Sequence, residues 1–181
     1  FLKRLDKLAA VNPTYLPRIH GYGLAARSGS MYLVTDVVDG ATWADAAIDD
    51  SKKLGVVEKL THAVEHLHGL GISHGDLHPG NVMLGRDWNV YLIDIPAFSH
   101  NTIETKNHRY SPENIDGSSS AQRDIFAVLR MSCELLGIEW GAESKEYPRV
   151  SDAINSELKD VEFGFKDLGR FKRALKSSVE V

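Results

Sequence analysis

Residues 74–84, HGDLHPGNVML, concentrate side chains that can do chemistry. They include two histidines, one aspartate, one asparagine, two glycines and one proline between apolar stretches. A carboxylate can accept or orient a proton, and oxygen atoms are the ligands that a hard cation such as Mg²⁺ requires. An ordinary soluble domain has little use for so many polar groups at the exit of a helix. The segment is therefore a candidate functional loop.

The elements on either side of this loop follow from apolar periodicity. Residues 51–71 predict an amphipathic helix, because six apolar residues share one face and glycines stand near its end. Those six are Leu54, Val57, Leu60, Val64, Leu67 and Leu70. Two short strands, 81–84 and 89–94, are expected after the loop. A second helix is expected at 121–137, where apolar residues on most faces indicate burial.

The remaining segments complete the order of elements. Helical spacing at 1–11 is ended by the prolines that follow, and 18–23 with 30–38 predict a β-hairpin. The further expectations are a connector with a short helix at 39–50, an irregular stretch at 95–120, and two weaker helices near 150–159 and 166–178. This order predicts an α+β fold whose second half is mostly helical.

Composition narrows the class of protein and partner. The 181 residues suffice for one domain with a core. The net charge of −4 disfavours nucleic acid as a partner, and no apolar run reaches the roughly 18 residues of a membrane span. The single cysteine, Cys133, excludes an internal disulfide and fits a reducing, cytoplasmic compartment. The chain starts with Phe1 inside a helical pattern, so we expect residues to precede it.

Five motifs, in order and with suitable gaps, resemble those of protein kinases and related phosphotransferases. They are the hinge-like YLVTDVVDG (32–40), the catalytic-loop pattern H-x-D-x-x-x-x-N (74–81), LID at a strand end (92–94), RYSPE (109–113) and the buried helix RDIFAVLRMSCELLG (123–137). The resemblance covers roughly residues 1–137. It implies a protein-kinase-like fold. Residues 1–38 would be a remnant of the N-lobe with the hinge, a helix end plus a hairpin, and residues 39–181 a mostly helical C-lobe.

The resemblance implies a catalytic and metal site within residues 74–94. Asp76 would accept or orient the proton of the substrate hydroxyl. Asn81 and Asp94 would hold Mg²⁺, and Asp94 would bridge it to the nucleotide phosphates. His78 stands where most protein kinases have Lys, and a histidine near a phosphate could carry part of a positive charge. His74 would pack beneath the metal-binding strand.

A nucleotide site at the hinge is also implied. The backbone of Asp36 and Val38 would bind the adenine edge. Thr35 would guard the pocket behind the base, and Met83 would form the apolar floor under it. ATP and Mg²⁺ are thus the cofactors that the resemblance implies.

Two acidic residues have implied structural roles. Asp124 would hydrogen-bond the backbone of the catalytic loop, and its plain alternative is to complement the dipole at the start of its helix. Glu113 would need an arginine partner from the tail, for which Arg170 and Arg173 are the candidates.

Several features of the family are missing. The glycine-rich phosphate loop and the strand with the phosphate-pairing Lys have no counterpart, and Asp6 is the only acid in residues 1–11. Gly75 replaces the arginine that clamps a phosphorylated activation loop, so control of that kind is not expected. DIP at 94–96 replaces D-F-G, and its proline should restrict movement of this tripeptide. Lys106 falls near the position of a threonine in Ser/Thr kinases, so the preferred hydroxyl stays open.

We expect ATP- and Mg²⁺-dependent transfer of a phosphoryl group to a protein hydroxyl, because RYSPE and the buried helix favour a protein kinase. The retained Asp76, Asn81 and Asp94 favour an enzyme. The missing Lys and glycine loop favour the alternative of a pseudokinase that acts as a scaffold. His78 favours a second alternative, a small-molecule phosphotransferase. The implied partners are a nucleotide and a protein substrate, and the uncovered N-lobe side could serve contact with a further copy or another protein.

A separate motif, HAVEH at 62–66, matches the H-x-x-E-H pattern of zinc proteases. Two histidines at i and i+4 could bind zinc, but the sequence places no convincing third ligand nearby. A helix face in contact with solvent is the better interpretation.

Overall fold

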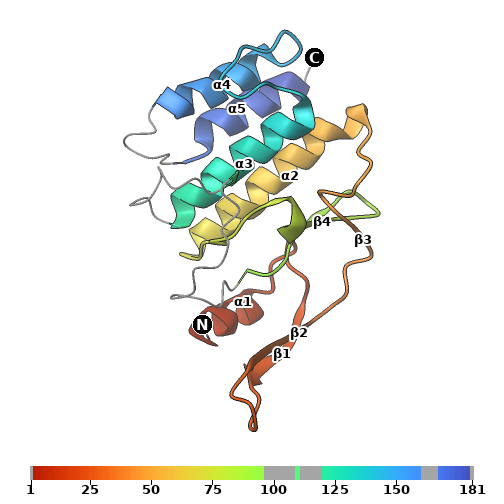
Figure 1. Ribbon diagram of the computed structural model, residues 1–181, viewed down its shortest axis with the longest axis vertical. Coiled ribbons are helices and arrows are strands. Elements are labelled where there is room, and N and C mark those ends of the chain that lie inside the picture. Colours follow the sequence, from red (N-terminus) through yellow and green to blue (C-terminus); the bar gives the residue numbers. More distant parts are fainter. Residues whose placement is uncertain (1, 96–108, 111–119, 160–166, 180–181) are drawn as a thin grey trace.

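The computed structural model describes residues 2–95, 109–110, 120–159 and 167–179. Its helices are α1 (Leu2–Val11), α2 (Asp50–Gly69), α3 (Ser120–Leu136), α4 (Pro148–Lys159) and α5 (Gly169–Val179). Its strands are β1 (Ile19–Leu24), β2 (Met31–Thr35), β3 (Gly40–Thr42), β4 (Val82–Gly85) and β5 (Val90–Leu92). Figure 1 shows α2 to α5 gathered at one end and the β1–β2 hairpin at the other. The α+β class and the helical second half are confirmed.

Helix α1 packs through its apolar face and then stops sharply. Leu5 and Leu8, three residues apart, are its buried side chains. The helix ends where Asn12 takes a positive φ of 45° and donates its N–H to the carbonyl of Leu8, a conformation that Asn tolerates. Pro13 follows, and because proline has no backbone N–H it cannot continue the hydrogen bonds of the helix. The predicted helix at 1–11 is therefore present.

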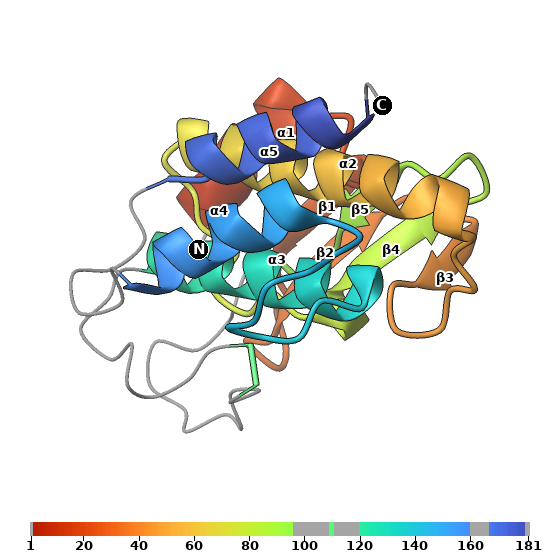
Figure 2. The ribbon, with the colours of Figure 1, turned by 90° about the horizontal axis from the view of Figure 1, so that it is seen from above.

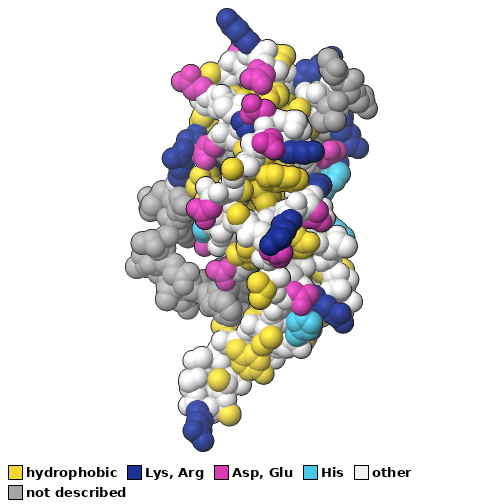
Figure 3. Space-filling model, turned by 90° about the vertical axis from the view of Figure 1, so that its right-hand side faces the viewer, with side chains coloured by type: hydrophobic (Ala, Val, Ile, Leu, Met, Phe, Trp, Pro, Cys, Tyr) yellow, Lys and Arg dark blue, Asp and Glu magenta, His cyan; other side chains and the backbone are white. Residues whose placement is uncertain are grey.

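Strands β1 and β2 form the predicted antiparallel hairpin, with Tyr22 opposite Leu33. The Tyr22 hydroxyl donates to Asp6 Oδ1 at 2.5 Å and ties the hairpin to α1. Figure 3 shows hydrophobic side chains on the outer surface of the hairpin. The exposed apolar residues there are Leu24, Tyr32 and Val34. The outer surface of the hairpin is therefore partly apolar.

Helix α2 is the central helix and contacts both α3 and α5 (Figure 2). Val57, Leu60, Val64 and Leu67 are buried, as the apolar stripe predicts. The two ends of the stripe, Leu54 and Leu70, are only half-buried. Because two helices pack on α2, its buried surface is wider than one stripe and also takes in Val56, Thr61 and Ala63.

A three-stranded antiparallel sheet in the order β3-β4-β5 lies beside α2. Strand β3 corrects the sequence analysis, since the short helix expected at 39–50 is absent and residues 43–45 form a turn. Gly40 pairs with Gly85, and a Cβ at Gly40 would lie 1.9 Å from the Leu84 carbonyl oxygen. The helix-like pattern of these residues is overridden by pairing with β4, a strand more than forty residues away.

Helix α3 is buried on most of its faces, as predicted. Its most buried apolar side chains are Ile125, Ala127, Val128, Leu129, Met131 and Cys133. Helices α4 and α5 pack on each other, and α5 also covers α2. Among the described residues, no helix is long and apolar enough to cross a membrane.

Candidate active site

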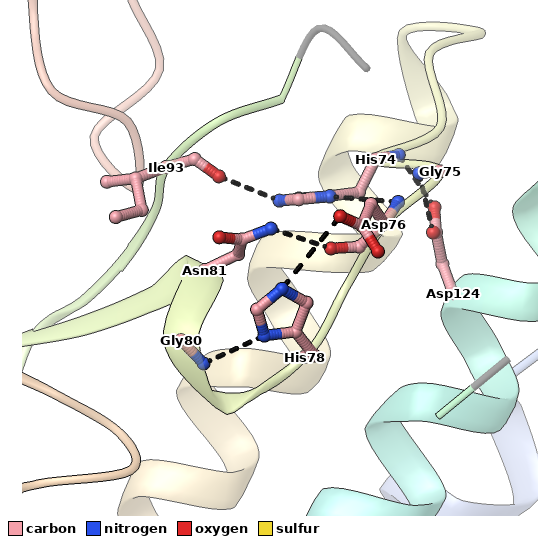
Figure 4. Close-up of polar contacts among 8 residues, drawn as sticks. All are labelled: His74, Gly75, Asp76, His78, Gly80, Asn81, Ile93 and Asp124. Atoms are coloured by element: carbon pink, nitrogen blue, oxygen red, sulfur yellow. Dashed lines mark hydrogen bonds and ion pairs between the residues drawn. The ribbon is translucent and has the colours of Figure 1, made fainter. Parts of the chain in front are cut away.

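The carboxylate of Asp124, on α3, holds the loop that follows α2 in place. Asp124 is only 1% exposed. Its Oδ2 accepts the backbone N–H of His74 at 2.7 Å, and its Oδ1 accepts that of Gly75 at 2.9 Å. Figure 4 shows both contacts beside the loop. Of the two roles considered for Asp124, the hydrogen bonds to the loop backbone are therefore present.

His68 is a site residue that the sequence analysis missed. Its Nε2 lies 2.9 Å from Asp124 Oδ2, so α2 also contributes to holding this carboxylate. The contact exists because α2 and α3 pack side by side. Only its position, six residues before His74 at the end of the helix, could have suggested a role.

His74 joins the loop to the strand end that follows β5. Its Nε2 lies 2.9 Å from the Ile93 carbonyl oxygen, and its ring is buried. Burial lowers the pKa of His74, against the opposing effects of Asp124, the Ile93 carbonyl, Asp76 and Asp94. A neutral ring donates from Nε2 to the carbonyl. This geometry is the packing beneath the strand that was expected of His74.

Asp76 and Asn81 are linked across the loop. The Asn81 side chain donates Nδ2–H to the carbonyl oxygen of Asp76 at 2.9 Å (Figure 4). The carbonyl of Asn81 accepts the N–H of Ile93 at 3.0 Å, which brings the strand end against the loop. The Asn81 amide nitrogen is a donor and is used by the Asp76 carbonyl. The amide oxygen of Asn81 is the acceptor and therefore the atom that can bind a cation.

His78 lies beside Asp76 in the same loop. Its Nδ1 accepts the N–H of Gly80 at 3.0 Å, so a neutral ring carries its proton on Nε2. This Nε2 lies 3.8 Å from Asp76 Oδ2, beyond hydrogen-bond distance. The two side chains are half-buried, so a substrate can reach both.

Asp94 adopts a positive φ of 59° and is exposed, whereas Ile95 is buried. A non-glycine residue in this region costs energy and is uncommon away from functional segments. Asp94 and Thr35 both line a cavity of about 80 Å³ whose walls include Leu5 and Leu8 of α1. The structure therefore brings Thr35 and Asp94 to one place.

Asp36 and Val38 of the hinge do not line that cavity. The N–H of Asp36 donates to the Arg18 carbonyl at 3.0 Å, and its carboxylate lies 2.5 Å from His20 Nε2. Asp36 and Val38 line a larger cavity of about 470 Å³, which Asp76, Asn81 and Asp94 do not line. Met83 is half-buried on β4 and lines neither cavity.

The part of RYSPE that the structure describes is docked on α3. Arg109 Nε donates to Glu134 Oε1 at 2.7 Å, and the Tyr110 hydroxyl donates to Glu134 Oε2 at 2.6 Å. Burial and the Glu134 carboxylate raise the pKa of Tyr110 to about 12. Glu113, together with any contact to Arg170 or Arg173, lies outside the described residues, as do Pro96 and Lys106.

The zinc interpretation of HAVEH gains no support from the structure. Glu65 Oε2 lies 2.5 Å from Lys172 Nζ on α5. Within the described ranges, no group of three or more His, Cys, Asp or Glu could hold a metal ion. This does not count against Mg²⁺, which proteins bind through one or two carboxylates with substrate phosphates.

Cys133 is buried, and burial raises its pKa to about 12, so it is an inert thiol.

Comparison with known proteins agrees with this geometry. The chain is 26% identical over 176 residues to the serine/threonine-protein kinase PrkC of Bacillus subtilis, a match that covers 88% of this chain and 26% of PrkC. A probable serine/threonine-protein kinase of Dictyostelium discoideum is 25% identical over 129 residues, covering 63% of this chain and 31% of that kinase. The ribosomal protein S6 kinase alpha-2 of Mus musculus is 32% identical over 97 residues, covering 49% of this chain and 13% of that kinase.

The chain is a distant homologue of serine/threonine protein kinases over much of its length. It spans less than a third of the length of each of these three relatives. No family model matches the chain. These relatives are protein kinases, a class whose members in general transfer a phosphoryl group from ATP with Mg²⁺.

Proposed function

We propose that this chain carries the catalytic loop of an enzyme that transfers the γ-phosphoryl group of ATP, with Mg²⁺, to a hydroxyl of a protein substrate. The observation that carries the proposal is the hydrogen bond between Asn81 Nδ2 and the Asp76 carbonyl. It lies in a loop whose backbone is held by the buried Asp124. Phosphoryl transfer depends on positioning and charge stabilisation, and this loop is built to hold its groups in position.

In the proposed reaction Asp76 orients the substrate hydroxyl and accepts its proton. The Asn81 amide oxygen and the Asp94 carboxylate would hold Mg²⁺, which supplies charge stabilisation for the transferred phosphoryl group. His78 Nε2–H faces the same side as the Asp76 carboxylate and could donate to a phosphate oxygen. His74 keeps the loop against the strand that bears Asp94.

The proposal assigns the base of the nucleotide to the hinge. The N–H of Asp36 is used by the Arg18 carbonyl, so contact with adenine falls to the Asp36 carbonyl and to the backbone of Val38. Thr35 lines the small cavity that Asp94 also lines, and it is proposed to guard the pocket behind the base. Met83 is proposed as the apolar contact under the base, from its position on β4 directly after the loop.

A second candidate is a binding module without transfer activity. It is favoured by the separation of cavities, since the hinge residues and Asp94 line different ones. A small-molecule phosphotransferase is the third candidate, favoured by His78 beside Asp76.

The first experiment is a thermal shift of this chain with ATP, with and without Mg²⁺, for the wild type and for Asp94→Asn. A Mg²⁺-dependent rise in Tm that Asp94→Asn loses would support the metal site. Asp152→Asn, which changes an exposed aspartate on α4, is the matched control and should keep the rise. The absence of any rise with ATP would contradict nucleotide binding by this chain.

Transfer is tested separately with radiolabelled ATP and two sets of acceptors, peptides that contain Ser, Thr or Tyr and small hydroxyl compounds. Asp76→Asn should retain ATP binding and lose transfer, because the carboxylate needed by the hydroxyl is gone. Unchanged turnover would remove Asp76 as the base. Labelling of small compounds alone would favour the third candidate, and ATP binding without transfer would favour the binding module.

A further inference from the structure

A further polar cavity lies on α2, and none of the loop residues 74–81 lines it, although Thr14 lines both this cavity and the 470 Å³ cavity of the hinge. It measures about 290 Å³ and is bounded by α2, by the segment that precedes β1 and by the turn between β4 and β5. Its polar lining consists of Thr14, Tyr15, Lys59, His62, His66 and Asn89. All of these side chains can donate a hydrogen bond, and no carboxylate is among the residues that line the cavity.

Lys59 is held in place at this cavity. Its Nζ donates to the Trp88 carbonyl at 3.1 Å and to Asn89 Oδ1 at 2.9 Å. An ammonium group has three N–H donors, so these two contacts fix its position and leave one donor for a ligand. Both partners are neutral, and the positive charge of Lys59 is therefore not cancelled by them.

His62 and His66 stand one helical turn apart on α2, on the same side as Lys59. Both histidines are exposed. The His66 ring meets the Tyr15 ring edge to face, with centroids 5.1 Å apart. An imidazole donates an N–H to an anion in either protonation state, so the pair adds two donors to the charge of Lys59.

Tyr15 contributes an unused donor to the wall of this cavity. Its hydroxyl is buried and has no hydrogen-bond partner among the described residues. Burial raises the pKa of Tyr15, so the hydroxyl keeps its proton. Its backbone is fixed, because its carbonyl accepts the N–H of Leu92 at 2.9 Å. A buried hydroxyl without a partner is costly.

The nearby charges favour an anion over a metal cation. Lys59 would repel a cation from the two histidines. Two of the acids in the neighbouring elements are engaged elsewhere, since Asp87 accepts from the N–H and the side-chain amide of Asn89. Glu65 pairs with Lys172 on α5. An ammonium group with several N–H and O–H donors is the usual environment of a phosphate.

We propose that Lys59, His62 and His66 form a binding site for a phosphate monoester on the α2 face of this protein. The phosphate oxygens accept hydrogen bonds from the Lys59 ammonium and from the two imidazoles. The group could be a free phosphorylated metabolite or a phosphorylated side chain of a protein, and the same donors serve both.

The test is calorimetric titration of the whole chain with inorganic phosphate at constant ionic strength, with histidine ring NMR as a second readout. We expect saturable binding that shifts the signals of His62 and His66. Lys59→Gln and His62→Gln should each weaken binding by about tenfold, the loss of one charge-assisted hydrogen bond. His62 is exposed and makes no hydrogen bond or ion pair with the described residues, so His62→Gln should fold even if Lys59→Gln loosens the β4–β5 turn.

Lys52→Gln removes a lysine from an exposed position two turns earlier on α2 and serves as the matched control. Equal weakening by Lys52→Gln, or no shift of His62 and His66, would overturn the proposal. Binding of Zn²⁺ without binding of phosphate would overturn it in favour of a metal site. A phosphoserine peptide that binds more tightly than inorganic phosphate would support the site with a protein ligand. Equal affinities would support it with a small ligand.

Discussion

Replacement of Asp124 is the most direct test of how the catalytic loop is held. Asp124 is 1% exposed and takes part in three polar contacts, with His74 N–H, with Gly75 N–H and with His68 Nε2. In Asp124→Asn the shape stays and one oxygen becomes an NH₂ group that cannot accept. The amide would turn so that its oxygen keeps the His74 and His68 contacts, and Gly75 N–H would lose its acceptor.

The magnitude follows from these contacts. A buried N–H without a partner costs about 1–3 kcal/mol, and hydrogen bonds to a charged acceptor exceed neutral ones by about 1 kcal/mol each. We therefore expect Asp124→Asn to lower the free energy of unfolding by about 3 kcal/mol. Asp124→Ala removes all three contacts and leaves a cavity, so its loss should reach about 3–5 kcal/mol.

Urea unfolding followed by far-UV circular dichroism measures the total loss, and amide hydrogen exchange locates it. In Asp124→Asn the amides of His74 and Gly75 should exchange faster than in the wild type. Their increase should be larger than that of the other amides of the loop. Asp152→Asn, at an exposed position of α4, is the control and should stay within about 0.5 kcal/mol of the wild type. If Asp124→Asn matched that control with both amides still protected, the buried carboxylate would not be what holds the loop.

Three further changes test other parts of the structure. Because burial lowers the pKa of His74 in the fold, its contribution to stability is complete above the unfolded value of about 6.5 and is lost as the pH falls toward the folded value. The free energy of unfolding should fall by up to about 1.4 kcal/mol per pH unit in that window, and His74→Gln should remove this slope. Glu134→Gln removes the charge that faces the Tyr110 hydroxyl, so the pKa of Tyr110 should fall below about 12 in a titration of tyrosinate absorbance. Gly71→Ala forces a φ of 68° on a residue with a Cβ and should cost about 1–2 kcal/mol in urea unfolding.

Each of these changes has a comparison that separates it from general disturbance. A wild-type pH slope that persists in His74→Gln would assign the effect to other histidines. The Glu134→Gln titration should show no difference in a Tyr110→Phe background. Gly55 lies within α2 with open space around it, so Gly55→Ala should stabilise the protein by about 0.5–1 kcal/mol. A loss in Gly55→Ala as large as that in Gly71→Ala would mean that backbone conformation is not the cause.

The elements with strong local periodicity were predictable from the sequence. Apolar spacing located α2 and α3, and the alternation around a Gly/Ser turn located the β1–β2 hairpin. The prediction of a short helix at 39–50 was wrong, because the local pattern of these residues resembles a helix. Strand β3 exists through hydrogen bonds to β4, where Gly40 lies against Leu84 and Gly85. No window of neighbouring residues contains that information.

The same division holds for the candidate site. The composition and order of the motifs were enough to propose Asp76, Asn81 and Asp94, and to offer two roles for Asp124. Tertiary structure decided between those roles, since the contacts of Asp124 with His74 and Gly75 span 50 and 49 residues. It also revealed His68, 56 residues from Asp124, and the cavity where Tyr15 meets His66.

The sequence by itself therefore located α2, α3 and the β1–β2 hairpin and proposed the loop that carries the chemistry, because periodicity and motif spacing are properties of neighbouring residues. Only the tertiary structure decided which distant groups satisfy the buried polar atoms of that loop. Those partners depend on how α2 and α3 pack, and packing depends on the shapes of side chains across the whole core.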